Sequence, residues 1–129
     1  MKLGKIAAAA GALQKLAGEA LTPRTLYRVS RLVSRAEKEL EFYNTARDKI
    51  VKTYGEHVKD AEYRIPGEKR AEFEDKMREL DEIEIEGEIQ TVRIPLDENI
   101  RLSCNDLRLL EGLVELEDEE NEGSVNHGA

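Results

Sequence analysis

Five basic side chains share one face of the polar stretch that follows Pro23, and they are the residues best suited to binding chemistry. Their steps of four, three, four and three residues place them along one side of an α-helix. The set is Arg24, Arg28, Arg31, Arg35 and Lys38. Guanidinium groups in such a row bind carboxylates and phosphates. The chain carries a net charge of −8 and Tyr27 is the only aromatic residue within the row, so we expect a docking face for carboxylates rather than nucleic acid.

A second row of charge lies between Asp81 and Gln90, where acidic residues alternate with isoleucine. This period of two predicts a strand whose exposed face carries Glu84, Glu86 and Glu88. A uniformly solvated row does not separate the pKa values of its members, as acid–base catalysis requires. We interpret the row as a solvated edge that resists aggregation. The alternative is an acidic surface that binds a basic protein or imitates nucleic acid.

No arrangement of residues in the sequence is typical of catalysis. Cys104 is the only cysteine, and the two histidines, His57 and His127, fall in a predicted loop and in a predicted tail. We interpret Cys104 as a small residue in the first turn of a buried helix rather than as a nucleophile. The glycines are isolated and form no phosphate-binding motif. We therefore predict no catalytic residue, no metal site, no cofactor and no enzymatic activity.

The basic row lies on a long helix that the sequence predicts over residues 23–54. Apolar residues on alternating three- and four-residue steps form a heptad seam along it. The seam comprises Leu26, Val29, Val33, Ala36, Leu40, Tyr43, Ile50 and Tyr54. Arg47 occupies the seam where an apolar residue is due, which indicates a buried ion pair or a register-setting residue at an oligomer interface. We expect Thr22 to cap the helix and Gly55 to end it in the left-handed conformation.

The remaining pattern predicts a mainly helical α+β fold. The long helix pairs with a later helix in an antiparallel, coiled-coil-like hairpin, beside a small two- to three-stranded β element and a short C-terminal helix. Ser103 and Asp106 have the spacing of a capping box for that last helix. A single domain spans residues 1–116, and residues 117–129 form an acidic disordered tail. The other expected elements are helices over residues 4–17, 67–80 and 104–115 and strands over residues 82–94 and 99–103.

Charge is distributed unequally along the 129 residues. Residues 1–60 contain twelve Lys and Arg against seven Asp and Glu, whereas residues 61–129 contain eight against twenty-one. We expect the two halves to complement each other within the fold or between subunits. No segment approaches the length of a membrane span, and Gln14 and Lys15 interrupt the apolar start before it could serve as a signal peptide. These features predict protein partners and a homo-oligomer, with no membrane and no direct nucleic-acid contact.

Several short motifs make the chain similar to a group of viral proteins. Between Leu21 and Leu113 it resembles small uncharacterised proteins encoded by tailed bacteriophages and prophages. The motifs are Leu21-Thr22-Pro23, Tyr27 to Leu32, Asn44, Ala46-Arg47, Val51, Tyr54-Gly55, Ile94-Pro95-Leu96, Leu102-Ser103 and Asp106-Leu107. The segment from Gly87 to Gln90 departs from their pattern, within the predicted strand region. None of these motifs is catalytic.

The resemblance implies a phage context, in the cytoplasm of the bacterial host or in the virion. Together with the seam, it favours a non-enzymatic interaction protein that oligomerises through its long helix. Its expected role is in virion assembly, as a minor structural component or an assembly chaperone. The alternative is an inhibitor of a host defence or nucleic-acid enzyme that acts through the acidic surface.

Overall fold

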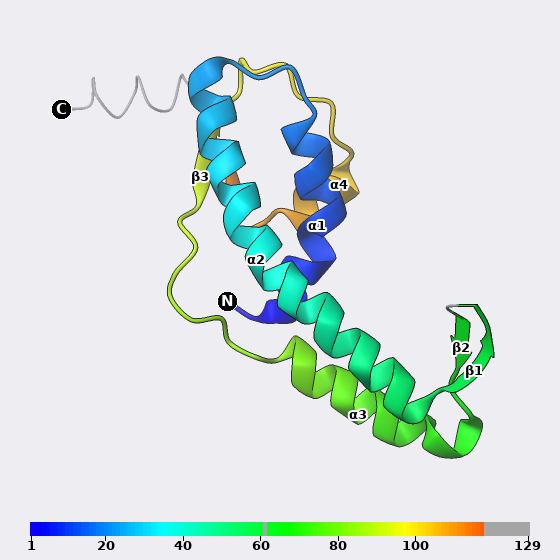
Figure 1. The fold of residues 1–129 in the computed structure, drawn as a ribbon. Helices are drawn as coiled ribbons and strands as arrows, with labels where there is room; N and C mark the ends of the chain where they lie inside the picture. The colour runs from blue at the N-terminus through cyan, green and yellow to red at the C-terminus, as the bar shows by residue number, and fades with distance from the viewer. Residues whose placement is uncertain (61, 118–129) are drawn as a thin grey trace. The chain divides into compact units, whose positions relative to one another are not determined.

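The computed structural model describes residues 1–60 and 62–117, and the predicted acidic tail lies outside these residues except for Glu117. The fold is α+β and mainly helical, with one long helix, two small sheets and a short C-terminal helix (Figure 1). Two compact units divide the chain. Unit 1 comprises Met1–Ala7 and Glu37–Gly87, and unit 2 comprises Ala8–Ala36 and the chain from Glu88 onward. The expectation of a single domain stays a prediction.

Helix α2 (Pro23–Tyr54) confirms the long helix. Its first backbone hydrogen bond runs from the Leu26 amide to the Thr22 carbonyl at 2.8 Å. At its other end Gly55 does not have the positive φ that the sequence predicted. Glycine is required there for space, because a Cβ on Gly55 would come within 2.5 Å of the Val51 carbonyl oxygen. The helix thus ends at a tight backbone contact.

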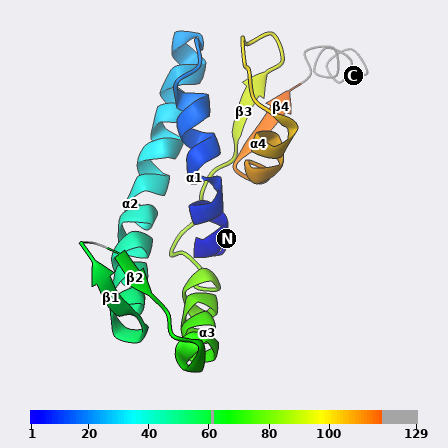
Figure 2. The same ribbon diagram turned by 90° about the vertical axis from the view of Figure 1, so that its right-hand side faces the viewer.

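Unit 1 contains a pair of antiparallel helices. Helix α3 (Arg70–Asp81), preceded by the short 3-10 helix η1 (Gly67–Lys69), runs back beside the C-terminal half of α2 in both ribbon views (Figures 1 and 2). The Tyr43 hydroxyl of α2 donates to the Asp81 carboxylate of α3 at 2.7 Å. The coiled-coil packing expected for this pair stays a prediction.

A β-hairpin connects the two helices of unit 1. Strands β1 (Glu56–Lys59) and β2 (Glu62–Arg64) pair antiparallel, with a register shift between His57 and Lys59. The His57 and Tyr63 rings meet edge to face across the hairpin, with their centroids 5.3 Å apart. The strands predicted from the sequence did not include β1 or β2.

The predicted strands over residues 82–94 and 99–103 are largely wrong. Within the described residues only β3 (Val92–Pro95) lies in the first range, together with an isolated bridge between Lys2 and Glu84. The second range contributes one isolated bridge, from Ala20 to Asn99. An alternating pattern needs a neighbouring strand to complete its hydrogen bonds, and residues 86–91 form no strand or bridge. Gly87, with a φ of 77°, also breaks the extended run.

Unit 2 contains the second sheet, in which β3 pairs parallel with β4 (Val114–Glu117). The connection between them includes helix α4 (Cys104–Leu109), which ends earlier than the predicted helix over residues 104–115. Gly112, with a φ of 88°, reverses the chain and lets Val114 pair with Val92. The predicted capping box is confirmed, because Ser103 accepts from the Asp106 amide at 3.0 Å and donates its own amide to the Asp106 carboxylate. The sequence therefore predicted the N-terminal cap of α4 correctly, but not the length of the helix.

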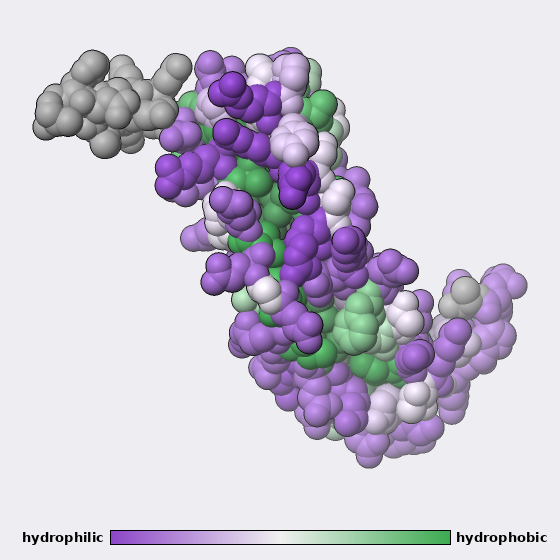
Figure 3. Space-filling model, turned by 60° about the vertical axis from the view of Figure 1, so that its left-hand side comes forward, coloured by the Kyte–Doolittle hydropathy of each residue, from purple (hydrophilic) through white to green (hydrophobic). Residues whose placement is uncertain are grey.

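The buried face of α2 differs by one residue from the predicted seam in its first turns. Val29 and Ala36 are buried as expected, but Thr25 and Leu32 take the places assigned to Leu26 and Val33. Within unit 2 this face belongs to a core of small and aliphatic side chains. The core residues of unit 2 are Ala9, Ala12, Leu13, Leu16, Val29, Leu32, Ala36, Val92, Ile94, Leu110 and Leu113. On the face shown in Figure 3, hydrophilic side chains surround apolar patches.

Candidate anion-binding cleft

Unit 2 contains an open cleft of about 530 Å³ between α2 and the segment that leads into β3. Buried Leu32 and Val92 form the apolar part of its wall. Arginine dominates the polar part. The other lining residues are Arg28, Arg31, Arg35, Glu88, Ile89, Gln90, Thr91 and Arg93.

Three of the cleft arginines come from one face of α2, as the sequence predicted. Their steps of three and four residues bring Arg28, Arg31 and Arg35 to the same side of the helix, flanking Leu32. Tyr27 orients the middle arginine: the Arg31 guanidinium donates to the Tyr27 hydroxyl at 3.0 Å and lies 5.7 Å from the centre of its ring. A guanidinium held in this way loses less conformational freedom when it binds a second partner.

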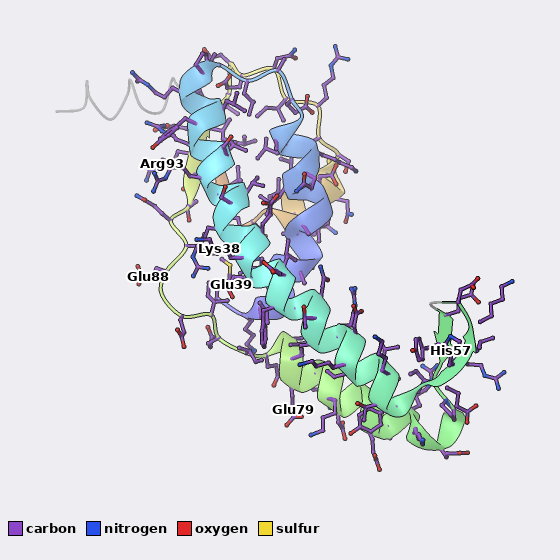
Figure 4. All side chains as sticks on the ribbon, viewed as in Figure 1. Lys38, Glu39, His57, Glu79, Glu88 and Arg93 are labelled. Carbon is purple, nitrogen blue, oxygen red and sulfur yellow. The ribbon has the colours of Figure 1, made fainter. Side chains whose placement is uncertain are left out.

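The fourth arginine comes from β3. Arg93 lies near two carboxylates of β4, with its nitrogens 3.9 Å from a Glu115 oxygen and 3.8 Å from a Glu117 oxygen. Its side chain is 64% exposed, so these long contacts are weak and exchange readily with another anion. Figure 4 shows Arg93 and Glu88 on the stretch that faces α2. Arg93 was not predicted as a binding residue from the sequence, because only the fold of unit 2 brings β3 and the basic row of α2 to the same cleft.

The cleft differs in sign from the protein as a whole. Four arginines and one glutamate, Glu88, give its lining a formal charge of +3, in a chain of net charge −8. Positive charge concentrated in a concave surface attracts anions more strongly than the same charge dispersed over a convex one. The cleft can therefore bind a carboxylate or phosphate group through several guanidinium hydrogen bonds.

The other predicted binding residues are not gathered in this cleft. Arg24 and Lys38 are exposed on α2 but do not line it. Arg47 is not a buried seam residue: its side chain is 46% exposed and lies 3.8 Å from the neighbouring Asp48. The physical reason is that the half-buried face of α2 passes through Ala46 instead.

The acidic row does not form a common strand face. Glu84 belongs to unit 1, where its carboxylate binds the Met1 amino group at 2.9 Å. A hydrogen bond and the positive charge of that amino group lower the pKa of Glu84. Glu86 is exposed in unit 1, whereas Glu88 belongs to unit 2 and lines the basic cleft. The row is thus divided among three surroundings.

Two glutamates that were not predicted from the sequence link distant segments of unit 2 by hydrogen bonds. Glu98 accepts from the Thr22 hydroxyl at 2.6 Å and from the Thr22 amide at 3.0 Å, at the start of α2. Glu19 accepts from the Arg101 amide at 2.9 Å. Hydrogen bonds from the side chains of Thr22 and Thr25 lower the pKa of Glu98. No local sequence signal reveals such pairs, since about eighty residues separate the partners.

Asp106 anchors α4 to helix α1 (Leu3–Ala17). Its carboxylate is buried and accepts from the Lys15 ammonium at 3.3 Å. Burial acts to raise the pKa of Asp106, but the hydrogen bonds with Ser103 and the Lys15 charge outweigh it and lower the pKa. Two elements of unit 2 whose contacting residues lie 91 positions apart in the sequence are thereby held together.

Unit 1 has a second open cleft, of about 490 Å³, with the opposite charge. Four of its carboxylates lie on one face of α3 and just beyond its end, next to Tyr54 of α2. They are partly neutralised: Asp75 lies 3.0 Å from an Arg78 nitrogen, and Glu79 lies 3.1 Å from the Lys76 ammonium. Lys76 and Arg78 line the cleft as well, so its formal charge is −2; the acidic lining residues are Glu72, Asp75, Glu79 and Glu82.

The reactive side chains are placed as follows. Cys104 is exposed at the start of α4, not buried as predicted, because Asp106 and not Cys104 occupies the inward position of that turn. In the described part of the chain, no group of three or more His, Cys, Asp or Glu could hold a metal ion. Among the helices of residues 1–60 and 62–117, none is long and apolar enough to cross a membrane.

Comparison with protein-family models, with curated proteins and with solved structures finds no match. The likeness to phage-encoded proteins therefore depends on the sequence motifs alone and stays a prediction.

Proposed function

We propose that this protein is a non-enzymatic interaction protein whose basic cleft docks a carboxylate-rich segment of a protein partner. The observation that carries the proposal is the convergence of Arg93 with three arginines of α2 on one open cleft in an acidic chain. Guanidinium groups on both sides of a cleft can bind successive carboxylates of an acidic peptide in paired hydrogen bonds.

The charge balance favours carboxylates over nucleic acid. A protein of net charge −8 repels a long polyanion as a whole, while a short acidic segment contacts only the local basic surface. The partner segment is therefore acidic and belongs to a protein.

The phage likeness supplies the biological setting of the proposal. In that setting the protein oligomerises through its long helix and acts in virion assembly, as a minor structural component or an assembly chaperone, in the host cytoplasm or the virion. Val29 and Ala36 are buried in unit 2, so the contact surface of α2 is its basic face rather than the apolar seam. The alternative role as an inhibitor acting through an acidic surface is weaker, because Glu84 already binds the amino terminus.

A peptide-binding measurement tests the docking proposal. We expect a fluorescent oligoglutamate peptide to bind the protein at low ionic strength, and an oligoglutamine peptide of equal length not to bind. The double variant Arg28→Glu, Arg31→Glu should bind at least about tenfold more weakly, equivalent to about 1.4 kcal/mol.

The matched control is Arg24→Glu, Lys38→Glu, which makes the same change in charge on the same helix outside the cleft. It should retain most of the affinity for the peptide. Equal losses in the two double variants would show that net charge, and not the cleft, determines binding. Tighter binding of single-stranded DNA than of oligoglutamate would also refute the proposal.

A further inference from the structure

The two clefts of this protein are complementary in charge and in spacing. On α3 and its C-terminal end, the acidic side chains recur at steps of three, four and three residues, from Glu72 to Glu82. On α2, the basic row recurs at steps of three and four residues from Arg28 to Arg35. Each step advances about 5 Å along a helix, so carboxylates of one row can meet guanidinium groups of the other at a common repeat.

We propose that the partner segment docked in the basic cleft is the acidic face of α3 from a second copy of this chain. The inference rests on the proposed function of the cleft and names its partner. Each cleft is lined only by residues of its own unit, so each docking surface is complete within that unit.

The acidic face of α3 is accessible for such a contact. The side chains of Asp75 and Glu79 are 68% and 69% exposed, and Glu79 projects outward from α3 (Figure 4). Their pairs with Arg78 and Lys76 are surface ion pairs within one helix, which contribute little and can rearrange. Exchange of these local pairs for guanidinium groups of a second copy replaces weak contacts with bidentate ones.

This docking joins two different surfaces and is therefore heterologous. A contact between unlike surfaces leaves one cleft and one acidic face unfilled at the ends of any open assembly, so it continues into a closed ring or a filament. The association is electrostatic and should weaken as salt shortens the Debye length. Self-association that disappears at high salt is the behaviour expected.

Charge reversal on each side tests the proposal. The cleft-reversed variant carries Arg28→Glu and Arg31→Glu, and the helix-reversed variant carries Glu72→Arg and Glu79→Arg. We expect the unaltered protein to self-associate in sedimentation velocity at low salt, and each variant alone to sediment as a monomer. An equimolar mixture of the two variants should associate again, because each acidic surface then faces a basic one.

Matched controls separate the docking faces from net charge. Arg24→Glu with Lys38→Glu, and Glu68→Arg with Glu74→Arg, change charge equally outside the two clefts and should self-associate like the unaltered protein. Circular dichroism should show the same helical content and melting temperature in every variant. A monomeric unaltered protein, persistent association of either reversed variant, or failure of the mixture to associate would each overturn the inference.

The same samples distinguish this inference from the proposed function. A protein that binds oligoglutamate through its cleft but stays monomeric retains the docking function and refutes docking of a second copy. A protein that associates but does not bind oligoglutamate refutes the general carboxylate cleft, and with it the inference that depends on it.

Discussion

The hydrogen bond from Tyr43 to Asp81 offers the sharpest test of how unit 1 is held together. It joins α2 to α3 across 38 residues of sequence, with the two oxygens 2.7 Å apart. Hydrogen bonds to charged groups contribute about 1.5 to 3 kcal/mol to stability. Because Tyr43 is only partly buried, we expect Tyr43→Phe to lower the free energy of unfolding by the smaller figure, about 1.5 kcal/mol.

The measurement is urea unfolding followed by circular dichroism, with Tyr27→Phe as the control. Tyr27 is 62% exposed and its hydroxyl accepts from Arg31 on the same helix, so its loss should cost less than about 0.5 kcal/mol. A double-mutant cycle with Asp81→Asn should give a coupling energy of about 1 kcal/mol. Equal effects of the two tyrosine substitutions, or no coupling with Asp81, would refute the assigned role of this bond.

The same bond predicts a dependence on alkaline pH. Burial, followed by the hydrogen bond and the charge of Asp81, raises the pKa of Tyr43 to about 12. The ordinary pKa of tyrosine is about 10, so the folded state favours the neutral hydroxyl. Its contribution is complete below pH 10 and is lost as the pH rises towards 12. Tyr43→Phe should therefore lose less stability than the unaltered protein over that interval.

Three further predictions concern packing and acid stability. Gly4→Ala should destabilise the protein by about 1 kcal/mol or more, because a Cβ would come within 2.8 Å of the Asp81 Cβ. Gly11→Ala, whose Cβ would meet nothing within 4 Å, should stabilise the protein by up to about 1 kcal/mol. Equal shifts in melting temperature for the two variants would contradict this reasoning. Leu113→Ala removes a fully buried side chain and should cost about 2 to 4 kcal/mol, while Leu116→Ala, at a side chain 41% exposed, should cost under about 1 kcal/mol, both measured by urea unfolding. Because the pKa of Glu98 is lowered in the folded state, its carboxylate contributes to stability above about pH 4, and this contribution is lost as the pH falls further. Glu98→Gln should therefore lower the free energy of unfolding at neutral pH and flatten the acid side of the stability profile. An unchanged profile would exclude the Glu98 carboxylate as the source of the acid dependence.

Local signals in the sequence predicted the local structure well. The apolar period and its stop residues gave α2 its bounds, and the spacing of Ser103 and Asp106 gave the capping box. Both depend on contacts within a few residues, which spacing alone determines. The basic row of α2 was found for the same reason, because residues three and four apart on a helix share a face.

Features that depend on distant contacts could not be read in this way. The alternation of isoleucine and glutamate has the period of a strand, but whether it pairs depends on a neighbour that the pattern does not contain. Helix α4 ends at Leu109, earlier than the helix predicted over residues 104–115. The residues after Gly112 instead form β4, which pairs parallel with β3. For the cleft, Arg93 became a candidate only when the fold placed it near the row that includes Arg31.

Helices α1 and α2 each begin in one unit and end in the other, and this limits how the protein can be divided. The boundaries after Ala7 and Ala36 fall inside helices, and only the one after Gly87 falls between elements. Neither unit is therefore a contiguous fragment that could be expressed alone, since a cut at Ala36 would sever α2. A ligand bound at the basic end of α2 stabilises the folded state against global unfolding, in which the turns of the helix towards Tyr54 also melt. Occupancy of the cleft should thus be detectable as slower amide exchange in turns that no ligand touches.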